Sequence, residues 1–559
     1  MKSNPRRNHS IALAMLMAVI APIATGTSWA NDGPPSLRQA IANGDIELND
    51  PDDLRYFVRN KHAAIVLGKA LFWDMQVGSD GVTACASCHF HAGADNRVKN
   101  QLNPGSPHLP PPYSTTFNTA GTDGPNYTLK ETDFPFHVRA NPADRDSKIL
   151  YDNDDVVGSQ GVIRVDFHYV IPGSPVDSGT LVPDPVFNVG GINVRQTTSR
   201  NSPTPINAVF NEVQFWDGRA VKDFNGVSPI GSDEPHAIVY RANRKGRIFP
   251  EEVSIGNASL ASQAVGPPLS AIEMSFLGRT WPDIGKKMFS LPPLALQIVA
   301  TDDSVLGPYA AAGTGLTVSY EKLVKMAFHP RWWRSHRLVS VNGEDYTQAE
   351  ANFSLIFGLA VQLYEATLIS DDTPYDRFQE GDLSALTFQQ QMGLDVFVNK
   401  GNCSGCHDGA LFTNNGFSGA GVRRIDEDMG MSSAQFKTPG LRNVELTGPY
   451  FHSGGHATLE DVIEVYDRGG NFEDSTDLSP IGFTVSEEEA LVAFLKSLTD
   501  ERVRYEREPF DHPQLFVPAG HAGDDNAVTN DGTGGALSDF VEIPATGAAG
   551  GSPLRPFLE

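Results

Sequence analysis

The sequence predicts a mainly α-helical protein of two domains, with long irregular insertions and a little β-structure. The chain has 559 residues, 40% of them hydrophobic, so it is too long for one compact core and too apolar for a disordered chain. Its 53 glycines and 39 prolines predict long irregular connections between elements. Its four cysteines form two close pairs far apart in the chain, which predicts one domain around each pair.

The net charge of −25 excludes one class of partner. A nucleic-acid-binding protein needs a basic stripe that displaces counterions from phosphates, and the sequence has none. An acidic surface instead attracts basic partners. We therefore expect no nucleic acid as a ligand.

The first thirty residues predict a secretory signal peptide. Lys2 and Arg6 give a charged start, and residues 11–24 form an apolar stretch too short to span a bilayer. Ser28 and Ala30 place small residues before a cleavage site near Ala30. No later segment is long and apolar enough to span a membrane. The sequence thus predicts an exported protein in an oxidising compartment, the periplasm.

Every cysteine belongs to a C-x-x-C-H motif. Two thiols three residues apart lie on one turn and can bond to the two vinyl groups of a porphyrin, and the adjacent histidine then becomes an axial ligand of the iron. A redox-active cysteine pair would be expected in a thioredoxin-like βαβ unit, and none is evident in the sequence. A zinc site would need further ligands, and the chain has no spare cysteine. The motifs predict two covalently bound haem c groups, held by Cys85, Cys88 and His89, and by Cys403, Cys406 and His407.

The remaining elements follow from periodicity and composition. Apolar residues at helical spacing predict a helix that leads into the first motif and three helices in the C-terminal part, over 60–74, 350–370, 387–399 and 486–498. Two polar stretches, about 101–192 and 221–258, are predicted insertions, the first with short β-like runs. We predict an N-terminal haem domain over 31–345, a C-terminal haem domain over 346–518 and a flexible tail over 519–559.

Five stretches of the sequence carry a resemblance to a known family, at 67–89, 200–220, 262–274, 399–407 and 436–470. They resemble the bacterial dihaem cytochrome c peroxidases, and within them the MauG-like branch. The resemblance implies two cytochrome c-like domains. The N-terminal haem would meet hydrogen peroxide, and the C-terminal haem would serve electron transfer. The matching stretches occur in the family's order: LGKALFWDMQVGSDGVTACASCH (67–89), RNSPTPINAVFNEVQFWDGRA (200–220), SQAVGPPLSAIEM (262–274), NKGNCSGCH (399–407) and the segment 436–470.

The resemblance also bears on the open face of the first haem. Many relatives block this iron with a histidine eight residues before the Asn of the R-N-S-P stretch, but this chain has Asn193 there. We therefore expect His89 on one face and an open second face, which suits ligand activation. The alternative is that a histidine from elsewhere caps the iron: His91, His137 or His168.

The family places a glutamine and a glutamate ten residues apart beside the open iron. The matching residues are Gln263 and Glu273, and Pro267 matches a proline that shapes the same pocket. A carboxylate can carry the peroxide proton from the near to the far oxygen, and an amide can orient the peroxide. We expect these three residues to be catalytic.

The second haem has His407 as one ligand, and the resemblance implies Tyr466 as the other. The peroxidases have methionine at that position, whereas the MauG-like branch has tyrosine, whose anionic oxygen stabilises ferric iron. Met429 and Met431 are the rival ligands, although neither aligns.

Two further roles are implied by the resemblance. Trp216 matches the tryptophan that lies between the haems and relays electrons. Asn201, Thr447 and Pro449 match the residues that hold a calcium ion between the domains, through an amide oxygen and backbone carbonyls.

Three functions remain open. The first is a peroxidase that reduces hydrogen peroxide with electrons from a small soluble donor protein, a cytochrome c or cupredoxin. The second is a MauG-like enzyme that oxidises residues of a partner protein. The third is an electron-transfer cytochrome without catalysis, disfavoured by Gln263 and Glu273. An oxygenase-type relative is a more distant alternative.

Overall fold

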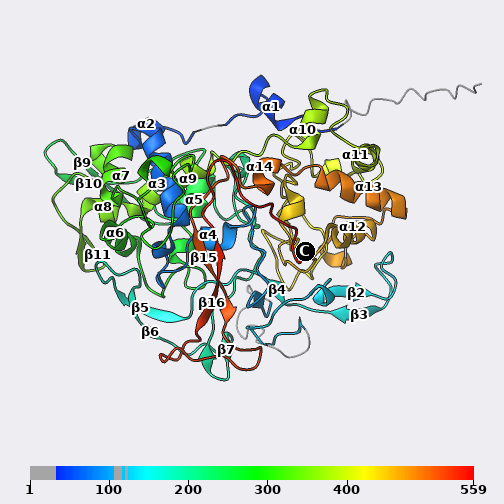
Figure 1. The fold of residues 1–559 in the computed structure, drawn as a ribbon, viewed down its shortest axis with the longest axis horizontal. Helices are drawn as coiled ribbons and strands as arrows, with labels where there is room; N and C mark the ends of the chain where they lie inside the picture. Colours follow the sequence, from blue (N-terminus) through cyan, green and yellow to red (C-terminus); the bar gives the residue numbers. More distant parts are fainter. Residues whose placement is uncertain (1–32, 49, 106–115, 120–123) are drawn as a thin grey trace, which may run out of the picture.

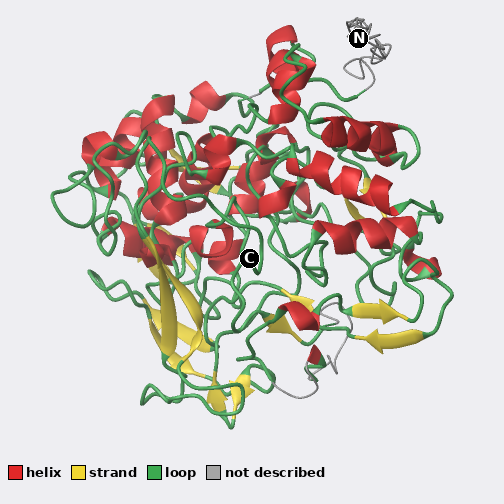
Figure 2. Ribbon diagram, turned by 45° about the vertical axis from the view of Figure 1, so that its right-hand side comes forward, coloured by secondary structure: helices red, strands yellow, loops and turns green. Residues whose placement is uncertain are grey.

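The computed structural model describes residues 33–48, 50–105, 116–119 and 124–559. Within these residues, fourteen α-helices form the body of the molecule, and sixteen short strands pair into eight two-stranded sheets. Figure 2 shows the helices gathered in the upper half and most hairpins below them. The predicted helical body with small β elements is confirmed in this coarse form. The predicted signal peptide lies outside the described residues.

The first core is built around two helices that cross at a glycine. Helix α3 (Lys61–Trp73) packs on α9 (Phe353–Glu365), and α5 (Ser259–Ala264), α6 (Trp281–Phe289) and α7 (Tyr320–Ala327) surround them. A Cβ on Gly68 would lie 1.9 Å from the carbonyl oxygen of Ala360, so only glycine permits this approach. Helix α3 ends at Trp73, and the chain then continues to the first C-x-x-C-H motif, which begins at Cys85.

The second core repeats the arrangement. Helix α11 (Phe388–Val398) packs on α13 (Val485–Lys496), and a Cβ on Gly393 would lie 1.9 Å from the carbonyl oxygen of Ala490. Thr387 caps α11 and shares a capping box with Gln390, so the helix start is encoded locally. Helices α10 (Pro374–Gln379) and α12 (Leu459–Asp467) belong to the same part of the fold. Each haem motif therefore follows one helix of a pair that crosses at a glycine.

The boundary between the cores differs from the predicted one. The sequence predicts it near residue 345, but α9 lies beyond that point and packs in the first core, which includes Leu368. The second core begins with Tyr375. The reason is tertiary: α9 is buried on all sides, and its partner α3 lies almost three hundred residues earlier, so no local pattern assigns it to either half.

The two ends of the chain each pack on the distant core. Helix α1 (Leu37–Asn43) lies beside α10 (Figure 1), and the Leu37 backbone N–H donates to Asp376 Oδ1 at 3.0 Å. Leu515 and Val517, near the other end, are fully buried in the first core. These contacts link the N-terminal and C-terminal parts of the chain.

The segment 519–559, predicted as a flexible tail, is built into the fold. Strand β15 (Leu515–His521) pairs antiparallel with β16 (Ser538–Ile543) and crosses the centre of the molecule in Figure 1. The Arg195 backbone N–H donates to His521 Nε2 at 2.9 Å. The Gly, Ala and Asp composition suggested mobility, but the segment gains strand partners and a buried histidine contact from distant parts of the chain.

The predicted insertions form hairpins on the helical body. The first carries β1 to β8, and the second carries β9 and β10. The strands are β1 (Leu102–Asn103), β2 (His137–Arg139), β3 (Ile149–Asp152), β4 (Val156–Val157), β5 (Val165–Tyr169), β6 (Ser178–Leu181), β7 (Asn188–Val189), β8 (Ile192–Asn193), β9 (Val239–Ala242) and β10 (Ile248–Glu251).

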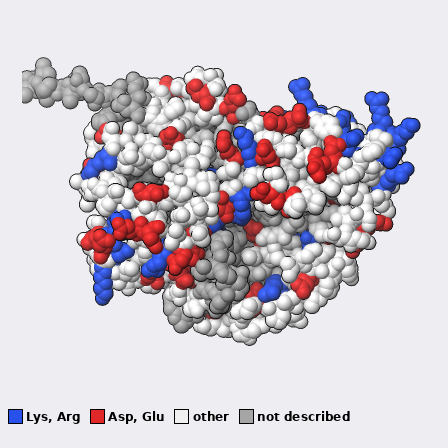
Figure 3. All heavy atoms as spheres, turned by 180° about the vertical axis from the view of Figure 1, so that it is seen from behind, with Lys and Arg blue, Asp and Glu red and all other residues white. Residues whose placement is uncertain are grey.

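Short elements complete the chain. They are α2 (Leu54–Phe57), α4 (Ala86–His89), α8 (Gln348–Ala351), α14 (Glu501–Arg504), β11 (Val339–Val341), β12 (Glu344–Tyr346), β13 (Phe417–Ser418) and β14 (Phe436–Lys437). Across the described part of the chain, none of the helices has the length and apolar character needed to cross a membrane. On the face seen in Figure 3, acidic side chains occur across the molecule, and many of the basic side chains gather along its upper right edge.

Candidate active site

The first cysteine motif forms a single turn that aims a histidine at a cavity. Cys85 precedes α4, Cys88 lies on it, and both thiols are free. His89 Nδ1 lies 2.9 Å from the Gly93 carbonyl oxygen, so the ring donates that proton and leaves Nε2 for a ligand. Burial lowers the pKa of His89, which outweighs the carbonyl contact, so the ring is neutral. A neutral, oriented imidazole is the form that binds iron.

The second motif is arranged in the same way. Cys403 lies on a 3₁₀ turn and Cys406 follows it, again with free thiols. His407 Nδ1 lies 3.0 Å from the Phe412 carbonyl oxygen and 3.1 Å from that of Pro439, so its Nε2 is also left for a ligand. Both motifs thus fit covalent haem c: two thiols on one turn beside a histidine whose second nitrogen is already engaged.

A cavity of about 410 Å³ gathers most of the residues singled out in the sequence. They come from α4, from the loop after the first insertion, from α5 and the turn after it, and from the loop before α12. The predicted residues that line the cavity are His89, Asn201, Trp216, Gln263, Pro267, Glu273, Thr447 and Pro449.

Glu273 and Gln263 reach the cavity from two neighbouring elements. Gln263 lies on α5, Pro267 begins the next 3₁₀ turn, and Glu273 follows it. The Glu273 backbone N–H donates to Ser270 Oγ at 3.3 Å, which holds the turn. Burial raises the pKa of the Glu273 carboxyl, and the Ser270 hydroxyl and the Arg219 charge only partly offset it. The group is therefore easier to protonate than an exposed glutamate.

The rival histidines have partners elsewhere. His91 Nε2 lies 2.8 Å from the Arg555 carbonyl oxygen, and His137 Nδ1 lies 3.1 Å from Asp152 Oδ1. His168 is exposed on β5, where its Nε2 lies 3.0 Å from Thr180 Oγ1. Among the described residues that line the cavity, His89 is the only histidine.

Trp216 lies between the cavity and the second motif. Its indole Nε1–H donates to the Asn201 carbonyl oxygen at 2.8 Å, and its backbone oxygen accepts from Lys437 at 2.8 Å. Lys437 belongs to β14, whose partner β13 carries Ser418 at 3.7 Å from Cys406 Sγ. The tryptophan thus adjoins the strand pair that contacts the second motif.

Tyr466 lies on α12, near the thiols of the second motif. Its ring centroid is 6.2 Å from that of Phe451. Burial, together with the nearby thiols of Cys403 and Cys406, raises the pKa of Tyr466 above its ordinary value. The rival ligands Met429 and Met431 are 56% and 52% exposed and point to solvent.

Asn201, Thr447 and Pro449 meet at the cavity wall, where the N-terminal and C-terminal parts join. The Asn201 backbone N–H donates to the His452 carbonyl oxygen at 2.8 Å, so the loops that carry these residues are joined directly. In the described ranges, no group of three or more His, Cys, Asp or Glu side chains is placed to hold a metal ion. A calcium site there would depend on amide and backbone oxygens.

Two further residues that line the cavity, Glu365 and Lys437, are not identified from the sequence. Glu365, at the end of α9, is 2% exposed, and its Oε2 has no hydrogen-bond partner in the described structure. Burial raises its pKa to about 8. Lys437 also lines the cavity, and burial lowers its pKa to about 8. The available signal for Glu365 was a single acid in a long apolar helix, a place where charges are rare.

Comparisons with known proteins identify a family and several relatives by sequence. The family described as di-haem cytochrome c peroxidase matches residues 179–384. Cytochrome-c peroxidase IdrP2 of Denitromonas iodatirespirans is 30% identical over 32% of this chain and 56% of its own length. Cytochrome c peroxidase Ccp of Escherichia coli is 27% identical over 56% of this chain and 52% of its own length. The methylamine utilization protein MauG of Methylorubrum extorquens is 34% identical over 25% of this chain and 43% of its own length.

The chain spans about half the length of the first of these relatives. Among solved structures, the diheme peroxidase BthA from Burkholderia thailandensis aligns at 17% identity with a TM-score of 0.41, over 80% of this chain and 88% of that chain. Two covalently bound haem c groups are what the matched family implies, and both C-x-x-C-H motifs fit them. By sequence, the chain is similar to the di-haem cytochrome c peroxidases and to MauG, and the family model matches its residues 179–384.

Proposed function

We propose that the protein is an exported dihaem c-type peroxidase that reduces hydrogen peroxide at the first haem site. The observation that carries the proposal is the shared cavity of His89, Gln263 and Glu273, in which His89 is the only histidine among the described lining residues. This supports an iron with one protein ligand and an open face beside an acid and an amide. An electron-transfer cytochrome would need neither group there.

The residues present fit the haem groups, and each side chain can be given a role. Cys85 and Cys88 would hold the first haem and His89 would ligate its iron, which supplies the centre that accepts a peroxide oxygen. Glu273 would carry a proton from the near to the far peroxide oxygen, for which its raised pKa is suited. The Gln263 amide would orient the peroxide, and Pro267 would limit the space for water beside Glu273.

The second haem site would store and deliver electrons. Cys403 and Cys406 would hold this haem, with His407 and Tyr466 as axial ligands. Trp216 would relay electrons between the two sites, since it borders the first cavity and adjoins the strand that leads to Cys406. The two cores around the two motifs would be the peroxidatic and the electron-transfer domains.

Further proposals concern the surroundings of the protein. A calcium ion would be held by Asn201, Thr447 and Pro449, whose loops meet at the cavity wall. The signal-like residues 1–30 support export to the periplasm with cleavage near Ala30. The electron donor would be a small soluble cytochrome c or cupredoxin, and the acidic chain favours a donor with a basic face.

One observation favours the alternative MauG-like activity, the oxidation of residues in a partner protein. Tyr466 lies near Cys403 and Cys406, whereas Met429 and Met431 point to solvent. An oxygen ligand helps the second haem reach higher oxidation states than a thioether would allow. The oxidised protein would then persist in the absence of a small donor.

Rapid mixing of the diferric holoprotein with hydrogen peroxide tests the proposal. We expect an immediate change in the haem absorption and consumption of peroxide without prior reduction. Glu273→Gln should slow this step by about 10²–10⁴-fold, because the proton carrier is lost. Glu212→Gln is the matched control, because the Glu212 side chain is 74% exposed and lies outside the cavity lining. An unchanged rate in Glu273→Gln would remove Glu273 from the mechanism, and reactivity only after reduction would mean a capped first haem.

A further inference from the structure

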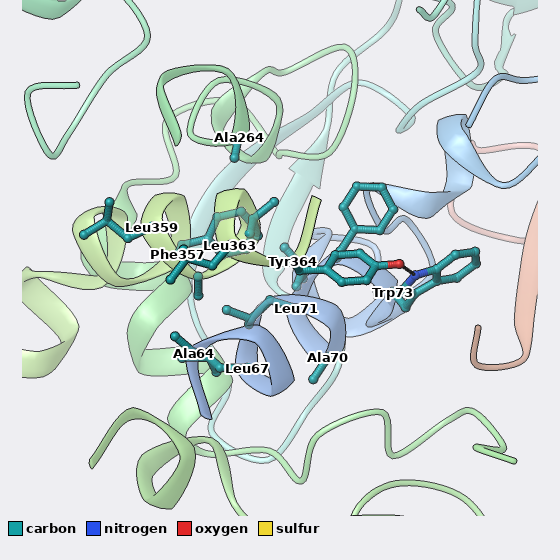
Figure 4. Close-up of a cluster of buried hydrophobic side chains, with 14 of the residues drawn as sticks. Ala64, Leu67, Ala70, Leu71, Trp73, Ala264, Phe357, Leu359, Leu363 and Tyr364 are labelled. Atoms are coloured by element: carbon teal, nitrogen blue, oxygen red, sulfur yellow. Dashed lines mark hydrogen bonds between the residues drawn. The ribbon is translucent and has the colours of Figure 1, made fainter. Parts of the chain in front are cut away.

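A chain of aromatic side chains runs from the haem ligand of the first site into the first core. The Phe72 ring centroid lies 6.4 Å from that of His89 and 5.5 Å from that of Tyr364. The Trp73 indole Nε1–H donates to the Tyr364 hydroxyl oxygen at 2.9 Å, the contact drawn in Figure 4. Trp73 and Tyr364 are 5% and 2% exposed, so bulk solvent does not reach them.

The chain of rings continues to the C-terminal segment. The Trp73 ring stacks on His512, with centroids 4.6 Å apart and planes inclined by 11°. His512 Nε2 lies 3.1 Å from Glu506 Oε1, and Glu506 is partly exposed at the edge of a surface groove that it lines with His91. The aromatic series therefore connects the buried side of His89 with the molecular surface.

The charges around the aromatic pair favour a positive charge on it. Lys69 Nζ lies 2.9 Å from Asp303 Oδ1 and 3.4 Å from Asp511 Oδ1, and all three side chains are fully buried. Two carboxylates thus face one ammonium group. Burial, together with the carboxylates of Asp511 and Asp303, raises the pKa of Tyr364 above its ordinary value, so their field reaches the phenol. The same field lowers the cost of removing an electron from a neighbouring ring.

This route is separate from Trp216. Trp73 does not line the 410 Å³ cavity but borders a smaller one of about 40 Å³, which it shares with His89, Tyr364 and His512. Trp216 lies in the other direction, beside β14 and the second motif. Trp73 and Trp216 therefore border different cavities, and both of these cavities are lined by His89.

We propose that Trp73, hydrogen-bonded to Tyr364 and stacked on His512, is an oxidisable relay that supplies a single electron to the first haem site from the surface near Glu506. The inference rests on the proposed peroxide reaction. Hydrogen peroxide takes two electrons and two protons to give two waters. When no donor has filled the second haem site, the first haem would supply one of these electrons and Trp73 the other. The two protons come from solvent, and a second equivalent of reductant would restore the haem. The indole keeps its N–H proton, shared with the Tyr364 oxygen. A soluble one-electron reductant such as ascorbate or a phenol returns the electron.

The test uses diferric holoprotein mixed with hydrogen peroxide and no donor. Rapid-freeze electron paramagnetic resonance detects the organic radical, and peptide mass spectrometry locates oxidised side chains. We expect a tryptophan radical and oxidation products at Trp73. Trp73→Phe should lose this radical, and Tyr364→Phe, which removes the hydrogen-bond acceptor, should lower its yield. Ascorbate added before peroxide should protect Trp73 from oxidation.

Trp281→Phe is the matched control. Trp281 is 4% exposed in the same core and packs on Phe357 at 5.1 Å, but it has no contact with the aromatic series. It should keep the radical of the unmodified protein. The exposed Met429 and Met431 report direct attack by peroxide, which their thioethers undergo without any relay.

Two outcomes are distinguishable. If the protein consumes peroxide but the radical and oxidation products lie at Trp216, or only at exposed methionines, the relay is overturned while the peroxidase proposal stands. If the same samples consume no peroxide at all, the proposed function itself fails. Survival of the radical unchanged in Trp73→Phe would also overturn the relay.

Discussion

The guanidinium group of Arg200 donates two hydrogen bonds, of 2.8 Å and 2.7 Å, to the carboxylate of Asp428, which lies 228 residues later in the chain. Arg200 precedes Asn201 at the cavity wall, and it also pairs with Asp217 at 2.7 Å. This buried pair joins the loop that carries Trp216 to the C-terminal part of the chain. The pair therefore helps to fix the position of the first haem site relative to the second haem site, between which electrons must pass.

Removing one partner of this pair should destabilise the protein. Asp428→Asn is expected to lower the free energy of unfolding by about 2–3 kcal/mol, somewhat below the ~3–5 kcal/mol typical of a broken buried pair, because Asp217 stays beside Arg200. Urea unfolding measures the change. Glu321→Gln, in an exposed i,i+4 pair with Lys325, should change stability by less than about 0.5 kcal/mol. Equal effects of the two changes would contradict the role of the buried pair.

The same pair predicts sensitivity to acid. Burial alone would raise the pKa of Asp428, but the Arg200 hydrogen bonds and charge outweigh it and hold this pKa at about 2. A depressed carboxyl pKa stabilises the fold above the unfolded value of about 4, and this contribution is lost as pH falls toward 2. Asp428→Asn should therefore flatten the stability curve in that interval, as acid unfolding followed by circular dichroism would measure.

Glu365 predicts the opposite dependence on pH. Burial raises its pKa to about 8 from 4.5, so the folded chain keeps a proton that the unfolded chain releases in between. Stability should fall as pH rises from about 4.5 to about 8, by at most about 1.4 kcal/mol per pH unit, and then level off. Glu365→Gln should remove this slope in urea unfolding of the holoprotein. The exposed Glu489→Gln is the control, and an identical slope in both variants would refute the assignment.

Gly161 should control the position of Glu273. A Cβ at Gly161 would lie 2.0 Å from the Ile272 carbonyl oxygen and 2.5 Å from that of Glu273. Gly161→Ala should therefore shift the Glu273 turn and slow the reaction with peroxide by about 10²-fold, since a displacement of about 1 Å is enough for such a loss. Stopped-flow mixing measures the rate. Gly313→Ala meets nothing within 4 Å and should react normally. A normal rate in both variants would mean that the first insertion does not position Glu273.

Tyr466 should decide the spectrum of the second haem. Tyr466→Phe removes the phenol that lies near Cys403 and Cys406, so the low-spin signal of that haem should change in absorption and electron paramagnetic resonance spectra. Tyr450→Phe is the control, because its partly buried hydroxyl donates to the Val444 carbonyl oxygen at 3.0 Å instead. If the Tyr466 variant retains the unmodified spectrum, another group ligates the iron.

Local sequence determined the parts of this protein that depend on neighbours in the chain. The thiols of Cys85 and Cys88 lie on one turn beside His89 whatever the rest of the fold does, and the capping box at Thr387 and Gln390 starts α11 by itself. For the same reason the helices that precede both haem motifs could be predicted. The resemblance also named Gln263 and Glu273, which the structure places in one cavity with His89.

Tertiary structure alone decided the rest, because those features depend on contacts between distant segments. Helix α9 joins the first core since Gly68 lets it approach α3, and β16 is ordered since β15 pairs with it. The buried Glu365 and the stacking of Trp73 on His512 depend on segments hundreds of residues apart. Periodicity records which face of an element is apolar, but not which distant element covers it.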